Sequence, residues 1–247
     1  MKIAVTMPGK IGALLYSLPT VRYVSKILGD KVDFWTQKEC LPVKRLLENQ
    51  SYINKVYINE SYVKQHDQCG VQPWFLEPEG KYDRIYHMGL RDYPKGRLVD
   101  YYPQIHGFTM CDTTISYDFD KKEIDKGICV SPGRNPALKS LFAHIMLHYS
   151  KVGPVYQIGP ANELVNIPVP NIINVTGDMY DCLPYIDASH LFFGTLSANL
   201  VLANGFSCKK VVVCEKERRF APHDIKDNHI YLDFPTTLEE VLSGEAV

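Results

Sequence analysis

Three short segments of the chain combine glycine with basic or hydroxylated residues, a pattern that suits the binding of an anion. Residues 8–12 read Pro-Gly-Lys-Ile-Gly, residues 131–134 read Ser-Pro-Gly-Arg, and residues 194–199 read Gly-Thr-Leu-Ser-Ala-Asn. Glycine lets a backbone approach a ligand closely, and a nearby lysine or arginine supplies the charge that a phosphate needs. The candidate binding residues are Lys10, Gly12, Ser131, Gly133, Arg134, Lys139, Gly194, Thr195, Ser197, Ala198 and Asn199.

Each of these segments, taken alone, also has a simpler interpretation. Residues 8–12 match neither GxGxxG nor a Walker A loop, and they suit an ordinary tight turn between a strand and a helix. The loop with Arg134 suits a solvated basic surface, and Ser197 suits the N-cap of a helix. What the three segments share is their position at the end of a predicted strand, where a following helix would favour an anion.

The histidines and cysteines give little support to other kinds of chemistry. His144 and His148 have i,i+4 spacing, but no third metal ligand is evident, so a packed or surface pair is favoured. The 7 cysteines form no CxxC pair, and buried free thiols in a reducing, cytoplasmic compartment explain them better than zinc. The sequence also lacks the Gly-x-Ser-x-Gly and His-Glu-x-x-His motifs of common hydrolases.

The composition is that of a globular protein without a dominant charge. The 247 residues include 27 Lys and Arg against 28 Asp and Glu, and 45% are hydrophobic. This balance excludes a wholly basic nucleic-acid binder but leaves room for a local basic patch. Since no apolar run approaches the roughly 18 residues of a membrane helix, we expect no membrane span.

The hydrophobic pattern of the first half predicts alternating strands and helices. Strands are expected over 2–7, 31–36, 55–58 and 82–87, and helices over 14–28, 41–49 and 98–108. Pro19 is expected to make the first helix start late or bend. Residues 59–81 suggest an irregular insertion, and residues 112–126 suggest a linker. This order predicts a parallel α/β domain over residues 1–126.

Residues 127–247 predict a second series of the same kind. Strands are expected over 127–131, 154–158, 172–175, 191–193 and 210–214, and helices over 139–149, 178–188, 200–203 and 237–242. Thr237 and Glu240 have the spacing of a capping box. The predicted fold class is therefore α/β, with two Rossmann-like domains, 1–126 and 127–247, that face each other across a cleft.

Taken in order, these segments resemble the heptosyltransferase-type family of GT-B glycosyltransferases. The family's opening strand, glycine turn and proline resemble IAVTMPGKIGALLYSLPTVR, and its Tyr-Asp strand resembles YDRIYHMGLR. Its second domain opens with a segment like VSPGRNPALK and continues with a turn like IGPANE. Its late phosphate loop resembles FFGTLSANLVLANG. The resemblance extends over nearly the whole chain.

The resemblance implies a metal-independent, inverting glycosyltransferase with a nucleotide-sugar as substrate and no permanently bound cofactor. The N-terminal domain would hold the acceptor near Lys10, Gly12 and Arg91, and the C-terminal domain would hold the donor. Gly159 and Glu163 would lie near the nucleoside, and the segments at 131–139 and 194–199 would line the diphosphate. A helix N-terminus and cations would stabilise the leaving diphosphate without a metal.

Two positions depart from the family's pattern. The family's catalytic aspartate corresponds to Ala13, which cannot take a proton, and the aspartate of its phosphate loop corresponds to Leu196. An inverting transfer needs a general base within hydrogen-bond reach of the acceptor hydroxyl. His87, at the end of a predicted strand, and Asp92 are the candidates for this base.

The leading hypothesis is transfer of a sugar to a hydroxyl of a glycan or of a hydroxymethylated DNA base. The alternative is a catalytically degenerate GT-B-like protein that binds a nucleotide or a glycan, which Ala13 favours. A nucleotide-sugar epimerase-like enzyme ranks below both, because the sequence offers no convincing pair of acid and base side chains.

Overall fold

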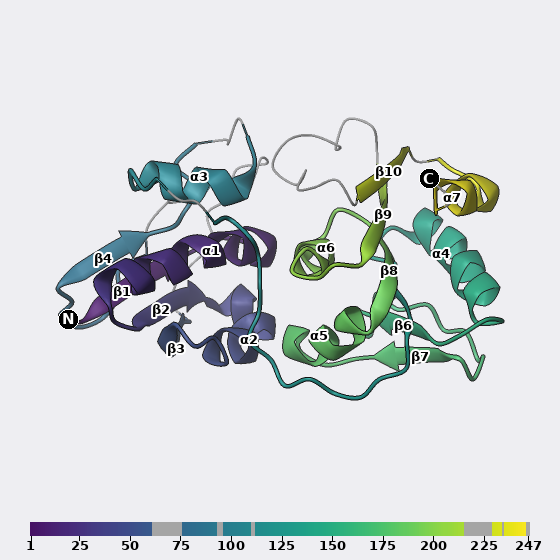
Figure 1. Ribbon diagram of the computed structural model, residues 1–247, viewed down its shortest axis with the longest axis horizontal. Coiled ribbons are helices and arrows are strands. Elements are labelled where there is room, and N and C mark those ends of the chain that lie inside the picture. The colour runs from purple at the N-terminus through teal and green to yellow at the C-terminus, as the bar shows by residue number, and fades with distance from the viewer. Residues whose placement is uncertain (61–75, 93–95, 110–111, 215–228, 234, 246–247) are drawn as a thin grey trace. The chain divides into compact units, whose positions relative to one another are not determined.

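Each half of the chain forms its own parallel β-sheet in the computed structural model (Figure 1). The structure describes residues 1–60, 76–92, 96–109, 112–214, 229–233 and 235–245. The chain divides into unit 1, Met1–Phe119, and unit 2, Asp120–Val247. The sequence places this boundary after Lys126 instead. The difference concerns residues 120–126, which pack with the rest of unit 2. For example, the Tyr156 hydroxyl donates to the Asp125 carbonyl at 2.7 Å.

Unit 1 contains a four-stranded parallel sheet in the order β3-β2-β1-β4. Its elements are β1 (Ile3–Met7), α1 (Ile11–Leu28), β2 (Val32–Gln37), η1 (Lys38–Val43), α2 (Lys44–Glu48), β3 (Ile53–Asn59), β4 (Arg84–His87) and α3 (Leu98–Ile105). The strand order reverses direction between β1 and β4. In open α/β sheets, ligands bind outside the carboxyl ends of the strands at such a switch point.

Helix α1 begins earlier than predicted, so the expectation of a late start is wrong. It begins at Ile11, which places Gly12 and Ala13 in its first turn rather than in the preceding loop. Pro19 is buried inside the helix, where it removes a backbone donor without ending the helix. The preceding turn is fixed from outside, because the side-chain amide of Gln37 donates to the Gly9 carbonyl at 3.1 Å.

The helix predicted over 41–49 is also different in the structure. A 3-10 helix, η1, spans Lys38–Val43, and only five residues, Lys44–Glu48, form the α-helix α2. Pro42 lies inside η1 rather than in the first turn of an α-helix. A proline lacks the N–H that an α-helical ladder needs, and this favours the short 3-10 segment.

Unit 2 contains a six-stranded parallel sheet in the order β10-β9-β8-β5-β6-β7. Its elements are β5 (Gly127–Ser131), α4 (Pro136–Tyr149), β6 (Val155–Ile158), β7 (Ile172–Val175), α5 (Met179–Asp187), β8 (Ser189–Gly194), α6 (Ala198–Ala203), β9 (Lys209–Cys214), β10 (His229–Asp233) and α7 (Leu238–Glu245). Strand β10 was not predicted. The order reverses between β5 and β8, which places this unit's switch point there.

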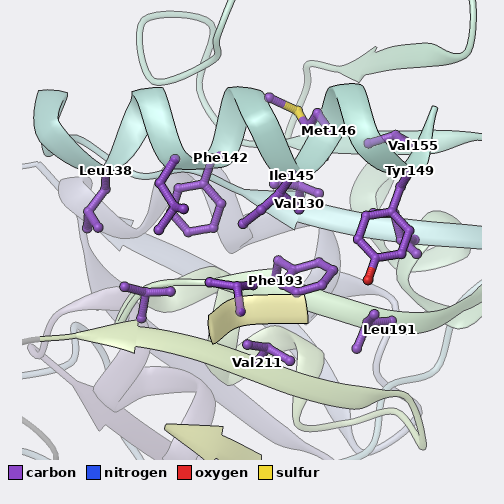
Figure 2. Packing of buried hydrophobic residues seen from close by; sticks show 14 of the residues in the cluster. Val130, Leu138, Phe142, Ile145, Met146, Tyr149, Val155, Leu191, Phe193 and Val211 are labelled. Carbon is purple, nitrogen blue, oxygen red and sulfur yellow. The ribbon is translucent and has the colours of Figure 1, made fainter. Parts of the chain in front are cut away.

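Helix α4 covers one side of the unit 2 sheet, while α5 and α6 lie on the other side (Figure 1). Phe142 and Ile145 pack against Val130 of β5 and Phe193 of β8, as Figure 2 shows. α4 begins at Pro136, before the predicted start at Lys139, because Asn135 caps it and accepts a hydrogen bond from the Ala137 amide at 3.0 Å. This packing fixes the β5–α4 loop relative to the sheet.

Other predictions concern smaller features. In the described part of the chain, five cysteines are free and buried, and Cys129, Cys182 and Cys214 are among them as predicted. Most of the insertion predicted over 59–81, namely residues 61–75, lies outside the described residues. Within the described segments, no helix combines the length and the apolar character needed to cross a membrane.

Candidate functional site

The loops that follow β5, β6 and β8 meet at the carboxyl edge of the unit 2 sheet. The side-chain amide of Asn199 donates to the Ser131 hydroxyl at 2.9 Å, although 68 residues separate them. Both side chains are buried, with 7% and 1% of their surface exposed. A Cβ atom placed on Gly159 would lie 3.7 Å from the same Asn199 nitrogen. Three loops that are distant in sequence therefore converge at the β5–β8 switch point.

Two glycines at this edge of the sheet lie where a side chain would clash. Gly133 has a φ of +71°, a conformation that disfavours other residues, and a Cβ there would lie 2.9 Å from the Thr195 hydroxyl oxygen. A Cβ on Gly194 would lie 2.6 Å from a ring carbon of Phe192 and 3.6 Å from the Ser131 Cβ. The β5 and β8 loops therefore approach each other closely at Gly133, while Gly194 leaves room for the Phe192 ring of its own strand.

The two predicted phosphate-binding cations are held by the loop after β6. Nε of Arg134 lies 2.6 Å from a Glu163 carboxylate oxygen, and Nζ of Lys139 donates to the Asn162 carbonyl at 3.1 Å. The Arg134 side chain is 86% exposed, whereas that of Glu163 is 14% exposed. Because the arginine of this pair is open to solvent, an anion at this loop can compete with Glu163 for it.

Ser197 occupies the N-cap position of α6, but its hydroxyl does not cap the helix. Among the described residues, this hydroxyl oxygen is buried and has no hydrogen-bond partner. A buried polar atom without a partner is uncommon in a native protein. The simple N-cap interpretation therefore does not account for Ser197, and Ala198 begins α6 directly after it.

The structure thus brings the predicted donor residues together. Ser131 ends β5, Gly133 and Arg134 follow it, and Lys139 lies in the first turn of α4. Gly159 and Glu163 follow β6. Gly194 ends β8, and it is followed by Thr195, Ser197 and the start of α6 with Ala198 and Asn199. The contacts above join residues from all three loops. Their role in binding a donor is not tested by these contacts and remains a prediction.

The switch point of unit 1 holds His87 at the end of β4. His87 and Thr6 are register partners on neighbouring strands, and the Nδ1 atom of His87 lies 2.8 Å from the Thr6 hydroxyl oxygen, within hydrogen-bond distance. Nε2 of His106 donates to the backbone carbonyl of His87 at 3.1 Å. Both the ring and the backbone of His87 are therefore held in place.

Burial controls the charge of these histidines. It lowers the pKa of His87 below the ordinary 6.5; the nearby Glu77 carboxylate acts in the opposite direction, and Arg91 lowers this pKa further. Burial, together with Arg91, lowers the pKa of His106 to about 4. Both imidazoles are therefore neutral at pH 7, the form in which a histidine can accept a proton.

The other candidates in unit 1 are more exposed. Asp92 is exposed, and it forms a hydrogen bond with Tyr101, whose pKa is raised by burial and further by this contact. Arg91 is exposed as well, and its backbone N–H donates to the Tyr101 hydroxyl at 2.9 Å. Lys10 is exposed at the N-cap of α1, and Gly12 follows inside the helix. Among these groups, His87 is the one fixed directly to the sheet.

Two residues of this arrangement, Thr6 and His106, were missed in the sequence. Thr6 is completely buried in β1, and it looks like an ordinary strand residue until the register places it beside His87. The sequence carried no signal for this pairing, because it depends on which strands become neighbours. His106 lies at the C-terminal end of α3, where only the fold brings it to the His87 backbone.

No group of three or more His, Cys, Asp or Glu residues is arranged to hold a metal ion within the described residues. His144 and His148, both on α4, form no such group with other described residues.

His106 makes a testable contribution to acid sensitivity. Unfolded, it binds a proton below about pH 6.5, but folded only below about pH 4, so stability should be lost as the pH falls through this window. The loss should be on the order of 1–3 kcal/mol, since solvent screens part of the effect. Urea unfolding at pH 7 and pH 5 should show a smaller pH effect in His106→Asn, and an unchanged pH effect would contradict this account.

The comparisons with known proteins rest on structure, because no family profile and no curated protein matches the sequence. A glycosyl transferase family 9 protein from Veillonella parvula superposes with a TM-score of 0.71 over 99% of this chain and 88% of its own, at 12% identity. E. coli heptosyltransferase WaaC gives 0.69 over 100% of both chains at 10% identity. The chain has the fold of heptosyltransferases.

E. coli ADP-heptose LPS heptosyltransferase II is a further similar structure. It gives a TM-score of 0.68 at 14% identity and covers 100% of this chain and 98% of its own. The resemblance to heptosyltransferase-type glycosyltransferases, with α/β units and parallel sheets, is therefore confirmed at the level of the fold. At these identities the likeness concerns the fold alone, and the reaction is argued from the residues.

Proposed function

We propose that this chain is a glycosyltransferase that moves a sugar from a nucleotide-sugar donor to an acceptor hydroxyl. Unit 2 binds the donor, and unit 1 binds the acceptor. The observation that carries the proposal is the convergence of the β5, β6 and β8 loops on the Ser131–Asn199 hydrogen bond at the switch point of unit 2. Such a point is where α/β sheets bind nucleotides.

The chemistry of these loops suits a diphosphate. Glycines at 133 and 194 let the backbone come close, Thr195 and Ser197 offer hydroxyls, and Arg134 and Lys139 supply positive charge. In the transfer, the sugar–phosphate bond breaks and negative charge develops on the leaving diphosphate. Fixed cations stabilise that charge, and we propose that they do so here without a bound metal. Gly159 and Glu163 are assigned to the nucleoside side of the same site.

His87 is the proposed general base. It stands at the switch point of unit 1, is held by Thr6 and is neutral at pH 7. It would replace the carboxylate that the heptosyltransferase pattern has at the position of Ala13. Asp92 is the second candidate, and Lys10, Gly12 and Arg91 are assigned to the acceptor side. This proposal makes the transfer a single displacement, which inverts the configuration at the anomeric carbon.

A thermal-shift panel tests the proposal. ADP, UDP, GDP, ADP-heptose, UDP-glucose and GDP-mannose are suitable probes; one similar structure, WaaC, is described with ADP-2-deoxy-2-fluoro heptose. A donor present at a hundred times its Kd should stabilise the protein by about 2.7 kcal/mol, which raises the melting temperature by several degrees. A panel in which no nucleotide or nucleotide-sugar raises the melting temperature would count against the proposal.

A binding protein without turnover is the second candidate, and Ala13 favours it. This candidate predicts a clear rise in melting temperature with one nucleotide or nucleotide-sugar. It predicts neither sugar transfer nor donor hydrolysis with any acceptor. The glycosyltransferase predicts both binding and release of the nucleoside diphosphate. Acceptors are to be tested as glycans and as hydroxymethylated DNA, where binding to DNA should weaken steeply with salt.

Glu163→Gln is expected to tighten the binding of inorganic pyrophosphate about two- to fivefold. The substitution frees Arg134 from its ion pair and removes a negative charge beside the anion, and because the arginine is exposed to solvent the gain should be small. Isothermal titration measures the change. Asp187→Asn is the matched control, because Asp187 precedes β8 at the opposite edge of the sheet. Unchanged or weaker binding by Glu163→Gln would show that the carboxylate does not compete for the arginine.

A further inference from the structure

Gln157 is a buried polar side chain in β6 that the proposed function has not used so far. It is completely shielded from solvent, and its register partners in the parallel sheet are Val130 on β5 and Asn174 on β7. Burying an amide is costly unless its polar atoms find hydrogen-bond partners. The partners of Gln157 therefore indicate which part of the structure it supports.

The Gln157 side chain binds the main chain of Val165 at two points. Its Oε1 atom accepts from the Val165 N–H at 2.6 Å, and its Nε2 atom donates to the Val165 carbonyl at 3.0 Å. Nε2 also donates to the Oδ1 atom of Asn174 at 2.6 Å. The orientation of the Gln157 amide is fixed by the first of these bonds, because a backbone N–H can only donate and must face Oε1.

These bonds close the loop that follows β6. The chain leaves the strand after Ile158 and returns to the Gln157 side chain at Val165, which also packs against the hydrophobic cluster that contains α4. Within the closed segment, the Glu163 N–H donates to the Pro160 carbonyl at 2.8 Å. The segment that carries Glu163 is therefore held at both ends.

Glu163 needs this support when a donor binds. Its carboxylate pairs with Arg134, whose side chain is 86% exposed. The proposed function assigns this arginine to the diphosphate, so a bound donor draws it away from Glu163. The hydrogen bonds of Gln157 lie in the interior, where water does not compete with them, and they do not depend on the exposed ion pair.

We propose that Gln157 is a positioning residue that closes the β6 loop and so keeps Glu163 at the nucleoside end of the donor site. Gln157 touches no ligand itself, because it is completely buried. This inference rests on the proposed function. It makes binding of the nucleoside depend on a loop that is already closed, whereas binding of the diphosphate depends on Arg134 and Lys139 outside that loop.

Binding measurements on the full chain separate these two parts of the donor. Gln157→Met keeps the length of the side chain but removes its hydrogen bonds, so the ligand itself must order the loop. The affinity for the nucleoside diphosphate that stabilises the protein most should fall about tenfold, as expected when about a tenth of the molecules have the loop closed. Pyrophosphate should bind as tightly as before or up to about fivefold more tightly, because Glu163 no longer holds Arg134.

Asn174→Ala is the matched control. Asn174 is exposed, so water can replace its bond to Gln157 while both bonds to Val165 remain, and nucleotide affinity should stay within about twofold. An equal loss of nucleotide affinity in both variants would overturn the inference, and so would unchanged nucleotide affinity in Gln157→Met. If Gln157→Met weakens pyrophosphate and nucleotide alike, general damage to unit 2 explains the loss and the inference is wrong.

Hydrogen exchange followed by backbone NMR, without any ligand, tests the closure of the loop itself. The Val165 amide should exchange at least about tenfold faster in Gln157→Met than in the wild type, while the amides of β6 keep their rates. An unchanged Val165 rate would overturn the inference.

Gln157→Asn provides the same measurements if Gln157→Met does not fold, because its amide is one methylene too short to reach Val165. A flat thermal-shift panel would remove the proposed function and the donor role of Gln157 together. A positive panel with an unchanged Val165 rate would remove the inference alone, so the two failures are distinguishable.

Discussion

Gly133→Ala is expected to weaken nucleotide binding by more than tenfold, the largest effect on affinity of any single substitution considered. The backbone at this position has a φ of +71°, and the new Cβ would lie 2.9 Å from the Thr195 hydroxyl oxygen. The strained backbone must therefore relax, and either the Thr195 hydroxyl rotates away or the β5 loop shifts away from the β8 loop. If the donor diphosphate binds between these loops, either change disturbs its site. Isothermal titration with the best nucleotide measures the loss.

Gly29→Ala is the control for backbone strain alone. Gly29 has a φ of +68°, but its Cβ would meet no atom within 4 Å. Both substitutions should reduce the free energy of unfolding by about 1–2 kcal/mol, because alanine disfavours the left-handed region. Only Gly133→Ala should lose nucleotide affinity. Equal affinity in both variants would place the donor somewhere other than the β5–β8 switch point.

His87→Gln is expected to reduce the rate of sugar transfer by about 10²–10⁴-fold, the range for loss of a general base. Glutamine is similar in length and can still pair with Thr6, so the fold and the donor affinity should persist. In the wild type, kcat should be level above about pH 6.5 and fall in more acidic solution, because the pKa of His87 is below its ordinary value and only the neutral ring accepts a proton.

Asp92→Asn is the matched control for the base. Asp92 is exposed and bound to Tyr101, so its loss should change kcat by less than about tenfold. If Asp92→Asn abolishes transfer and His87→Gln does not, the base is the carboxylate. If neither variant changes kcat, the assignment of the base to this end of unit 1 is wrong.

Much of the architecture follows from local signals in the sequence. The bounds of β5 and β7 agree with the prediction, because each is a short apolar run. The capping box at the start of α7 is present: the Thr237 amide donates to the Glu240 carboxylate at 2.7 Å, and the Glu240 amide donates to the Thr237 hydroxyl at 3.2 Å. The three glycine-containing segments could be identified because glycine at a strand end lets the backbone approach a ligand closely.

Helix starts were less well predicted, for a reason visible at α4. The Asn-Pro pair at 135–136 is a good N-cap and first-turn signal, but the hydrophobic pattern alone suggested a start at Lys139. At α1, Pro19 suggested a late start that the packing of the helix overrode. Tertiary packing of a long apolar face outweighs the loss of one backbone hydrogen bond.

The decisive contacts of both candidate sites could not be predicted from the sequence. The Thr6–His87 pair spans 81 residues and the Ser131–Asn199 pair spans 68. Each depends on which strands become neighbours where the strand order reverses. Similarly, the ion pair between Arg134 and Glu163 joins two residues that were assigned separately from the sequence, one to the diphosphate and the other to the nucleoside.

The most direct test of the central claim is to map nucleotide binding by backbone amide NMR of the full chain, with the nucleotide that the thermal-shift panel selects. The account predicts that the largest chemical-shift changes fall on residues 131–134, 159–163 and 194–199 of unit 2. Changes confined to unit 1, or spread without regard to these three loops, would contradict the claim that the donor binds where β5 and β8 diverge.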